Sequence, residues 1–275
     1  MDEERKRAEE EAKRREIEER RKKLEEERKR LEDEKKRINK KKNTDIVNPP
    51  SPYAVSFTWV NRRKVTKVKY QGTCGSCWAF TAAAVLEANY LIRNNKSVDL
   101  SEQYILDCAE DQNGRKAGSC NGGWYTGVFD YINRNNPELE NNNRYKTADR
   151  TCIPSRIRGR KYRVMAWGYV KRNAGIPTVK AMKEALCKYG PLAGAVKVTT
   201  AFQAYAGGIF DEHTSVRNER DVNHAIVIVG WDDNKKSWLV KNSWGENWGD
   251  NGYVWIEYGC NNIGYGAAWV VVDKE

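Results

Sequence analysis

One short stretch of the chain, residues 71–80, places a cysteine where it could act as a nucleophile. After Cys77, apolar residues recur at helical spacing as far as about residue 93, so we predict a helix that begins at Cys77. At a helix N-terminus a thiol meets the positive end of the helix dipole, which favours the nucleophilic thiolate. The alternative is a redox or zinc pair with Cys74, but no second Cys-x-x-Cys and no nearby histidine completes such a site, so we predict no metal.

A nucleophilic thiol needs a base, and the chain has only two histidines. His224 precedes an apolar run over residues 225–229, so we expect it at the start of a core strand that would hold the ring rigidly. His213 lies in a polar stretch and is expected to be solvated. We therefore predict that His224 is the base and forms a thiolate–imidazolium couple with Cys77.

Two amide side chains complete this hypothesis. Asn242 could accept a hydrogen bond from the imidazole, as in the Cys–His–Asn version of a catalytic triad. Gln71 could donate an N–H beside the backbone N–H of Cys77, and the two donors would form an oxyanion hole. The chemistry expected of this set is acyl transfer through a thioester.

The composition of the chain excludes several other functions. Of 275 residues, 39% are hydrophobic and 11% are aromatic, which is enough for a core and argues against full disorder. No apolar run reaches the roughly 18 residues of a membrane span, and seven scattered cysteines are too few for a disulfide miniprotein. The net charge of +11 comes without a phosphate loop or zinc-finger spacing, so we predict no nucleic-acid partner.

The first 43 residues differ from the rest because 34 of them are charged. Frequent acid–base pairs four residues apart predict a long charged helix. A seven-residue repeat of apolar residues is formed by Ile17, Leu24, Leu31 and Ile38, but the second position that a coiled coil needs to be apolar holds Arg or Lys. Three interpretations therefore stay open: a lone helix, a weak coiled coil, and a disordered or nucleic-acid-binding tail. Self-association or tethering through this arm is a hypothesis. Three prolines in residues 44–56 then predict a linker.

After the linker, the pattern changes from helical to strand-like near residue 162. This change predicts an α+β fold, with a helical lobe over residues 57–161 and a β-rich lobe over residues 162–275. Further predicted helices cover residues 101–108, 124–133 and 179–189, and predicted strands cover residues 191–198, 225–231, 237–241, 252–258 and 267–272.

Several short motifs accompany the order Gln71, Cys77, His224, Asn242. They are C-G-S-C-W at residues 74–78, L-S-E-Q at 100–103, C-N-G-G at 120–123, G-I-F at 208–210, N-H-A at 223–225 and K-N-S-W-G at 241–245. With these motifs the chain resembles the papain family of cysteine proteases, and the cathepsins within it, over about residues 53–272. The resemblance implies a two-lobed α+β fold, helical on one side and β-barrel-like on the other, with no cofactor.

The resemblance also implies a role for each position of the site. Cys77 would be the nucleophile, His224 the base and then the acid for the leaving amine, and Asn242 the group that orients the ring. Gln71 and the backbone N–H of Cys77 would hold the oxyanion.

Four further residues are implied in substrate binding. Trp244 resembles the indole that shields the His–Asn hydrogen bond from water. Gly122 and Gly123 resemble residues whose backbone pairs with an extended peptide, and an ordinary glycine turn is the alternative. Asn223, next to the predicted base, is placed in the same group.

The resemblance implies two disulfides, Cys74–Cys120 and Cys108–Cys152, which leave Cys77 as a free thiol. Cys187 and Cys260 match no pairing of the family; we predict that they pair with each other, with two buried thiols as the alternative. Disulfides imply an oxidising compartment, secreted or lysosome-like. Because the first residues show no apolar signal segment, we interpret the chain as a fragment of a longer protein.

The function predicted from these observations is that of a cysteine endopeptidase acting on peptides or proteins. The alternatives are an exopeptidase variant and a catalytically silent binding protein on the same fold. A third hypothesis makes tethering by the arm the main role of the chain.

Overall fold

We describe the protein from a computed structural model that places residues 48–274, apart from 112, 215–217 and 219. Within residues 1–47 only Glu18, Glu19, Lys22, Glu25, Glu26 and Lys29 are described, and they are helical. Apart from these six residues, the predicted helix over residues 1–43 and its coiled coil therefore lie outside the described residues, and so do residues 44–47 of the predicted linker. No helix of the described part is long and apolar enough to cross a bilayer.

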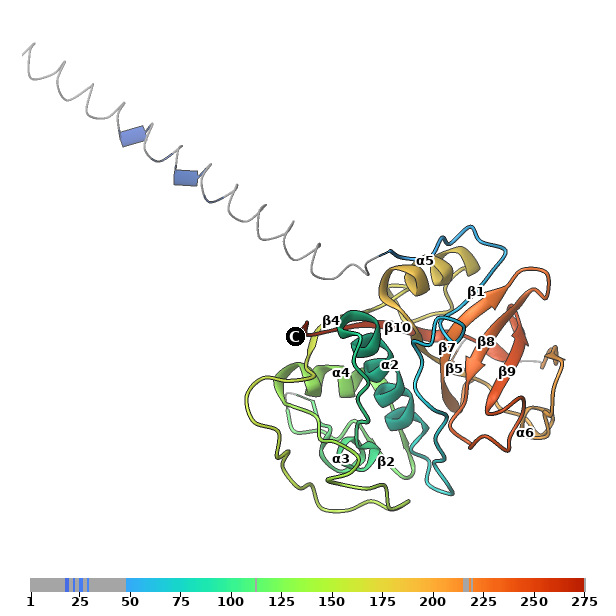
Figure 1. Ribbon diagram of the computed structural model, residues 1–275, viewed down its shortest axis with the longest axis horizontal. Helices are drawn as coiled ribbons and strands as arrows, with labels where there is room; N and C mark the ends of the chain where they lie inside the picture. Colours follow the sequence, from blue (N-terminus) through green and yellow to red (C-terminus); the bar gives the residue numbers. More distant parts are fainter. Residues whose placement is uncertain are drawn as a thin grey trace, which may run out of the picture. The chain divides into compact units, whose positions relative to one another are not determined.

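The helical part is built around α2 (Cys77–Asn94), which begins at the cysteine predicted to start it. Twelve of its eighteen residues are buried, many of them alanines that let neighbouring elements approach closely. α3 (Glu102–Cys108) begins after Ser101, whose side chain caps the helix by accepting a hydrogen bond from the backbone N–H of Tyr104. α4 (Tyr125–Arg134) completes the group that Figure 1 draws in green.

The sheet follows in the second half of the chain. Its strand order is β4 (Val164–Tyr169), β10 (Tyr265–Val272), β5 (Leu192–Val196), β7 (His224–Asp232), β8 (Ser237–Lys241), β9 (Tyr253–Glu257) and β6 (Ile209–Phe210). All neighbours are antiparallel except β6 and β9. β1 (Ser56–Thr58), far away in sequence, pairs with β7 beside the path (Figure 1).

Smaller elements connect these parts. α5 (Val179–Tyr189) precedes β5, α6 (Thr200–Gln203) follows it, and the 3-10 helix η1 (Cys260–Asn262) lies between β9 and β10. β2 (Gly118–Ser119) and β3 (Gly122–Gly123) form a separate two-stranded ribbon beside α2.

β7 is the strand that joins the two cores. Its residues Ala225, Val227 and Val229 pack with α2, α3 and α4, whereas Ile226 and Ile228 pack with α5 and β9. This alternation is the period of two expected of a strand that is buried on both faces. It explains why the sequence here is a continuous apolar run.

The predicted helices and the five predicted strands are confirmed within two residues at each end. The structure adds β1, β4, β6, α6 and the ribbon β2–β3, which were not predicted. β4 is the longest of these, and its burial pattern shows no clean alternation, so its strand character comes from pairing with β10.

Candidate active site

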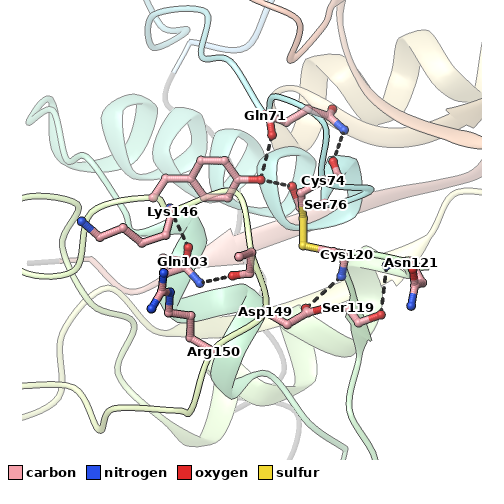
Figure 2. Close-up of a disulfide and its surroundings, with 12 residues drawn as sticks. Gln71, Cys74, Ser76, Gln103, Ser119, Cys120, Asn121, Lys146, Asp149 and Arg150 are labelled. Carbon is pink, nitrogen blue, oxygen red and sulfur yellow. Dashed lines mark hydrogen bonds between the residues drawn. A yellow bond between two sulfur atoms is a disulfide. The ribbon is translucent and has the colours of Figure 1, made fainter.

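Cys77 is the first residue of α2, and the turn before it is fixed by a disulfide and by backbone contacts. The Cys74–Cys120 bridge joins this turn to the ribbon β2–β3 (Figure 2). The Gly75 N–H also donates to the Cys120 carbonyl at 2.7 Å. A Cβ at Gly75 would lie 2.5 Å from that carbonyl oxygen, so only glycine fits there. The approach of the chain to the nucleophile position is therefore rigid.

His224 opens β7, as predicted, and its ring is bonded to Asn242. The ring Nε2 lies 2.8 Å from Asn242 Oδ1, and both residues are buried. The same Oδ1 accepts the backbone N–H of Ser243 at 2.8 Å, so this atom must be the oxygen of the amide. His224 Nε2 must then donate, which leaves Nδ1 of the neutral ring as the acceptor for a thiol proton.

The sulfur and the ring line one cleft, although no hydrogen bond joins them within the described residues. Burial raises the pKa of the Cys77 thiol, an effect opposed by the backbone N–H groups of Ala225, Trp78 and Cys77 itself. Burial also lowers the pKa of His224 to about 4, opposed by the hydrogen bond to Asn242. Burial thus favours the neutral thiol and the neutral imidazole, whereas the sequence led us to expect the ion pair.

An aromatic cluster covers the His–Asn pair. Trp244 lies 4.7 Å from the His224 ring, centroid to centroid, at an interplanar angle of 34°. Trp248 and Phe202 pack in turn on Trp244, at 5.0 and 5.9 Å. The indole of Trp244 can therefore keep water from the buried hydrogen bond, which strengthens it.

Gln71 is held so that one N–H remains available. Its Nε2 donates to the Cys74 carbonyl at 2.9 Å, which fixes the orientation of the amide, and its Oε1 accepts from Ser243 Oγ at 2.7 Å (Figure 2 draws the first bond). The second hydrogen on Nε2 has no partner among the described residues. Because Gln71 and Cys77 line the same cleft, this hydrogen can serve an oxyanion formed there.

The cleft has a volume of about 490 Å³ and is lined by residues of both cores, among them Gly122, Gly123, Trp244 and Asn223. A Cβ at Gly123 would lie 2.6 Å from the Trp78 ring, so the packing against this ring requires a glycine here. Gly122 has φ +117° with open space around it, so its backbone is accessible. Asn223 is less available, because its side chain bonds the backbone of Val198 through both Oδ1 and Nδ2.

A buried ion network behind the His–Asn pair was missed by the sequence reasoning. Lys69 Nζ lies 3.0 Å from Glu87 Oε1 and 2.7 Å from Glu102 Oε1, and the two carboxylates are 1% and 2% exposed. Burial raises the pKa of Glu102 to about 8, opposed by Lys69. A small cavity connects this network to Asn242 and Ser243. The only sequence signal was the L-S-E-Q motif, which contains Glu102.

The structure contains the disulfides Cys74–Cys120 and Cys108–Cys152 and a free Cys77. The predicted Cys187–Cys260 disulfide is wrong, since both thiols are free and buried. The two cysteines were paired only because no other partner was left for them, and this reasoning says nothing about the distance between them in the fold. The sulfur of Cys260 lies against His213 and Glu257 instead.

Comparison with known proteins finds one family and several similar relatives. The family model described as papain family cysteine protease matches residues 53–271. Digestive cysteine proteinase 3 from Homarus americanus is 36% identical over 207 residues, and cathepsin S from Bos taurus is 37% identical over 203 residues. These alignments cover 74% and 72% of this chain but 61% and 58% of the two relatives, so the chain spans about three fifths of their length.

Solved structures of similar fold are also found. The bromelain protease from Ananas comosus, in complex with the E64 inhibitor, matches with a TM-score of 0.65 at 31% identity, covering 80% of this chain and all of that one. A structure from work on the mite allergens Blo t 1 and Der p 1 matches with a TM-score of 0.70 at 27% identity, covering 82% of this chain and 74% of that one.

Proposed function

Because the chain belongs to the papain family of cysteine proteases, we propose that it hydrolyses peptide bonds with Cys77 as nucleophile and His224 as base. The observation that carries the proposal is the double use of Asn242 Oδ1. It accepts from Ser243 N and from His224 Nε2, which leaves the ring with its other nitrogen unprotonated and ready for the thiol proton.

The reaction proceeds through a thioester. The Cys77 proton moves to His224 Nδ1, and the sulfur attacks the scissile carbonyl carbon. The resulting oxyanion accepts hydrogen bonds from Gln71 Nε2 and from the backbone N–H of Cys77. The imidazolium then protonates the leaving amine, and water, activated by the same ring, hydrolyses the thioester and frees the thiol.

The substrate is an extended peptide or protein chain. The accessible backbone of Gly122 supports pairing with such a chain, and Trp244 shields the reacting groups from water. The stretch between Cys108 and Cys120 contains no histidine, so we expect no paired-histidine loop that would block the cleft for a carboxypeptidase, and endopeptidase action is the form proposed. We propose a secreted or lysosome-like location, which the two disulfides and the likeness to cathepsins support.

The domain boundaries belong to the same proposal. Residues 1–43 form a charged arm that can tether or self-associate, residues 44–56 a linker, residues 57–161 the lobe with the nucleophile, and residues 162–275 the lobe with the base. The composition of each segment supports this division.

The test is selective alkylation of the non-reduced protein with limiting iodoacetamide at about pH 5.5, where an ordinary thiol is almost fully protonated. We expect single-site labelling at Cys77, because the neutral His224 ring takes the thiol proton as the sulfur attacks the reagent. This labelling should be lost in His224→Ala, and the parent protein should cleave a peptide substrate. Cys187 and Cys260 are the internal controls, because both are buried free thiols. Labelling of Cys77 that His224→Ala does not slow, in a protein without peptidase activity, would favour a silent binding protein.

A further inference from the structure

Outside the cleft, three side chains of different chemistry meet from three segments of the chain. His213 lies in the loop after β6, Glu257 ends β9, and Cys260 begins η1. The His213 side chain is 69% exposed and that of Glu257 is 32% exposed, whereas Cys260 is fully buried. The cluster thus combines a buried sulfur with an imidazole and a carboxylate that reach the surface. An ion from solution can therefore reach the sulfur past these two side chains.

The distances within the cluster match one face of a coordination tetrahedron. His213 Nε2 lies 3.1 Å from Glu257 Oε2 and 3.8 Å from Cys260 Sγ, and the sulfur lies 3.6 Å from the same carboxylate oxygen. Zinc bonds of about 2.3 Å to sulfur and about 2.0–2.1 Å to nitrogen or oxygen, at tetrahedral angles, place such ligand atoms roughly 3.3–3.6 Å apart. Shifts of a few tenths of an ångström, mostly in the exposed imidazole, would satisfy this geometry.

We propose that His213, Glu257 and Cys260 form a zinc-binding site. The donor set of one imidazole nitrogen, one carboxylate oxygen and one thiolate suits Zn²⁺ better than Mg²⁺ or Ca²⁺, which prefer oxygen ligands alone. Three protein ligands leave the fourth tetrahedral position for water. Asp211 and Glu212 lie close enough to act electrostatically on Cys260, and their negative charge favours a cation there. On binding, the Cys260 thiol proton is released to solvent and a zinc–sulfur bond forms.

The site lies on the segment that leads into the candidate base. Next to Cys260, Asn262 Nδ2 donates to the Asn218 carbonyl at 2.8 Å, and Asn261 exchanges hydrogen bonds with the backbone of Lys197. These contacts anchor the chain that continues into β7, whose first residue is His224. A zinc ion that ties the loop of His213 to η1 would therefore stabilise one rim of the cleft.

The experiment uses the full chain as the Cys77→Ala variant, because a free active-site thiol and imidazole could bind metal themselves. Cobalt chloride is titrated in, and the thiolate-to-cobalt charge-transfer absorption is followed; zinc chloride is then added to displace the cobalt. We expect one equivalent of cobalt bound with a thiolate band that zinc removes. Cys187→Ala, which removes the other buried free thiol, is the matched control and should leave the band unchanged.

Three variants assign the ligands. Cys260→Ala should abolish the thiolate band, and the surface changes His213→Ala and Glu257→Gln should each weaken cobalt binding at least roughly tenfold, since even the loss of an outer partner of a ligand costs 10–100-fold. The two surface variants keep the test decisive if Cys260→Ala fails to fold. Absence of a thiolate band in the parent protein, or unchanged affinity in both surface variants, would overturn the proposal and leave an ordinary His–Glu ion pair beside a thiol.

Discussion

Removing the side chain of Asn242 is the sharpest test of how the site works. In Asn242→Ala, the Nε2–H of His224 loses its acceptor at 2.8 Å while the ring stays buried. The ring is then free to place its proton on Nδ1, where it can no longer accept the proton of Cys77. We expect the loss to fall on kcat, because substrate binding does not depend on this hydrogen bond.

The size of the effect follows from the burial of the pair. A buried donor left without a partner costs about 1–3 kcal/mol. At about 1.36 kcal/mol for each factor of ten, this corresponds to a decrease of roughly 5- to 150-fold in kcat/KM. The hydrogen bond to Asn242 also raises the pKa of His224. Without it the imidazolium deprotonates at lower pH, and because the neutral ring is the base, the acidic limb of the pH–rate profile should move to lower pH.

Steady-state cleavage of a fluorogenic peptide over a range of pH measures both effects. Asn89→Ala is the matched control, because Asn89 is an equally buried asparagine that bonds the backbone of Tyr189 and Val272 away from the cleft. It should lower stability and leave kcat/KM of the folded enzyme unchanged. If Asn242→Ala kept its activity within twofold, or lost activity with an unmoved acidic limb, the assigned role of Asn242 would be refuted.

Further predictions concern the oxyanion site, the buried charges and the titration of the base. Gln71→Ala should lower kcat about 10²–10³-fold in steady-state kinetics, since one oxyanion donor is lost; an effect on KM alone would contradict this. Lys69→Met should lower the free energy of unfolding in denaturant by about 3–5 kcal/mol, because Glu87 is left buried without its cation; a loss below about 1 kcal/mol would count against a buried pair. In Cys77→Ala, burial lowers the pKa of His224 to about 4, whereas a histidine in the unfolded chain titrates near 6.5. Between about pH 6.5 and pH 4 the unfolded chain therefore binds more protons than the folded protein. The free energy of unfolding should fall as the pH drops through this range, by about 3 kcal/mol at pH 4. Chemical unfolding at several pH values checks this, and the same slope in His224→Phe would disprove the assignment.

Much of this site could be predicted from the sequence because its signals are local. The helix after Cys77 and the strand after His224 are each predicted by an apolar pattern that starts at the functional residue. Both elements are also buried on most sides, so tertiary context does not override these patterns.

Other features depend on contacts between distant segments. Glu87 is a charged residue of a type that is seldom fully buried, yet it is buried because Lys69 reaches it from another segment. The thiol of Cys260 meets His213 from 47 residues away in sequence, a spacing that no metal motif describes. Elimination therefore suggested a disulfide, where the fold places a histidine and a carboxylate.

The alternation of β7 has a consequence for how the cleft behaves in solution. Ala225 and Val227 pack in the same core as Ala79 and Ala82 of α2, so the nucleophile and the base stand on two elements of one packed interior. Widening the distance between them would require opening that interior, which costs nearly as much as unfolding it. The catalytic groups should therefore behave as a rigid template to which the substrate conforms. On heating, loss of activity should coincide with cooperative melting of the protease part and not precede it.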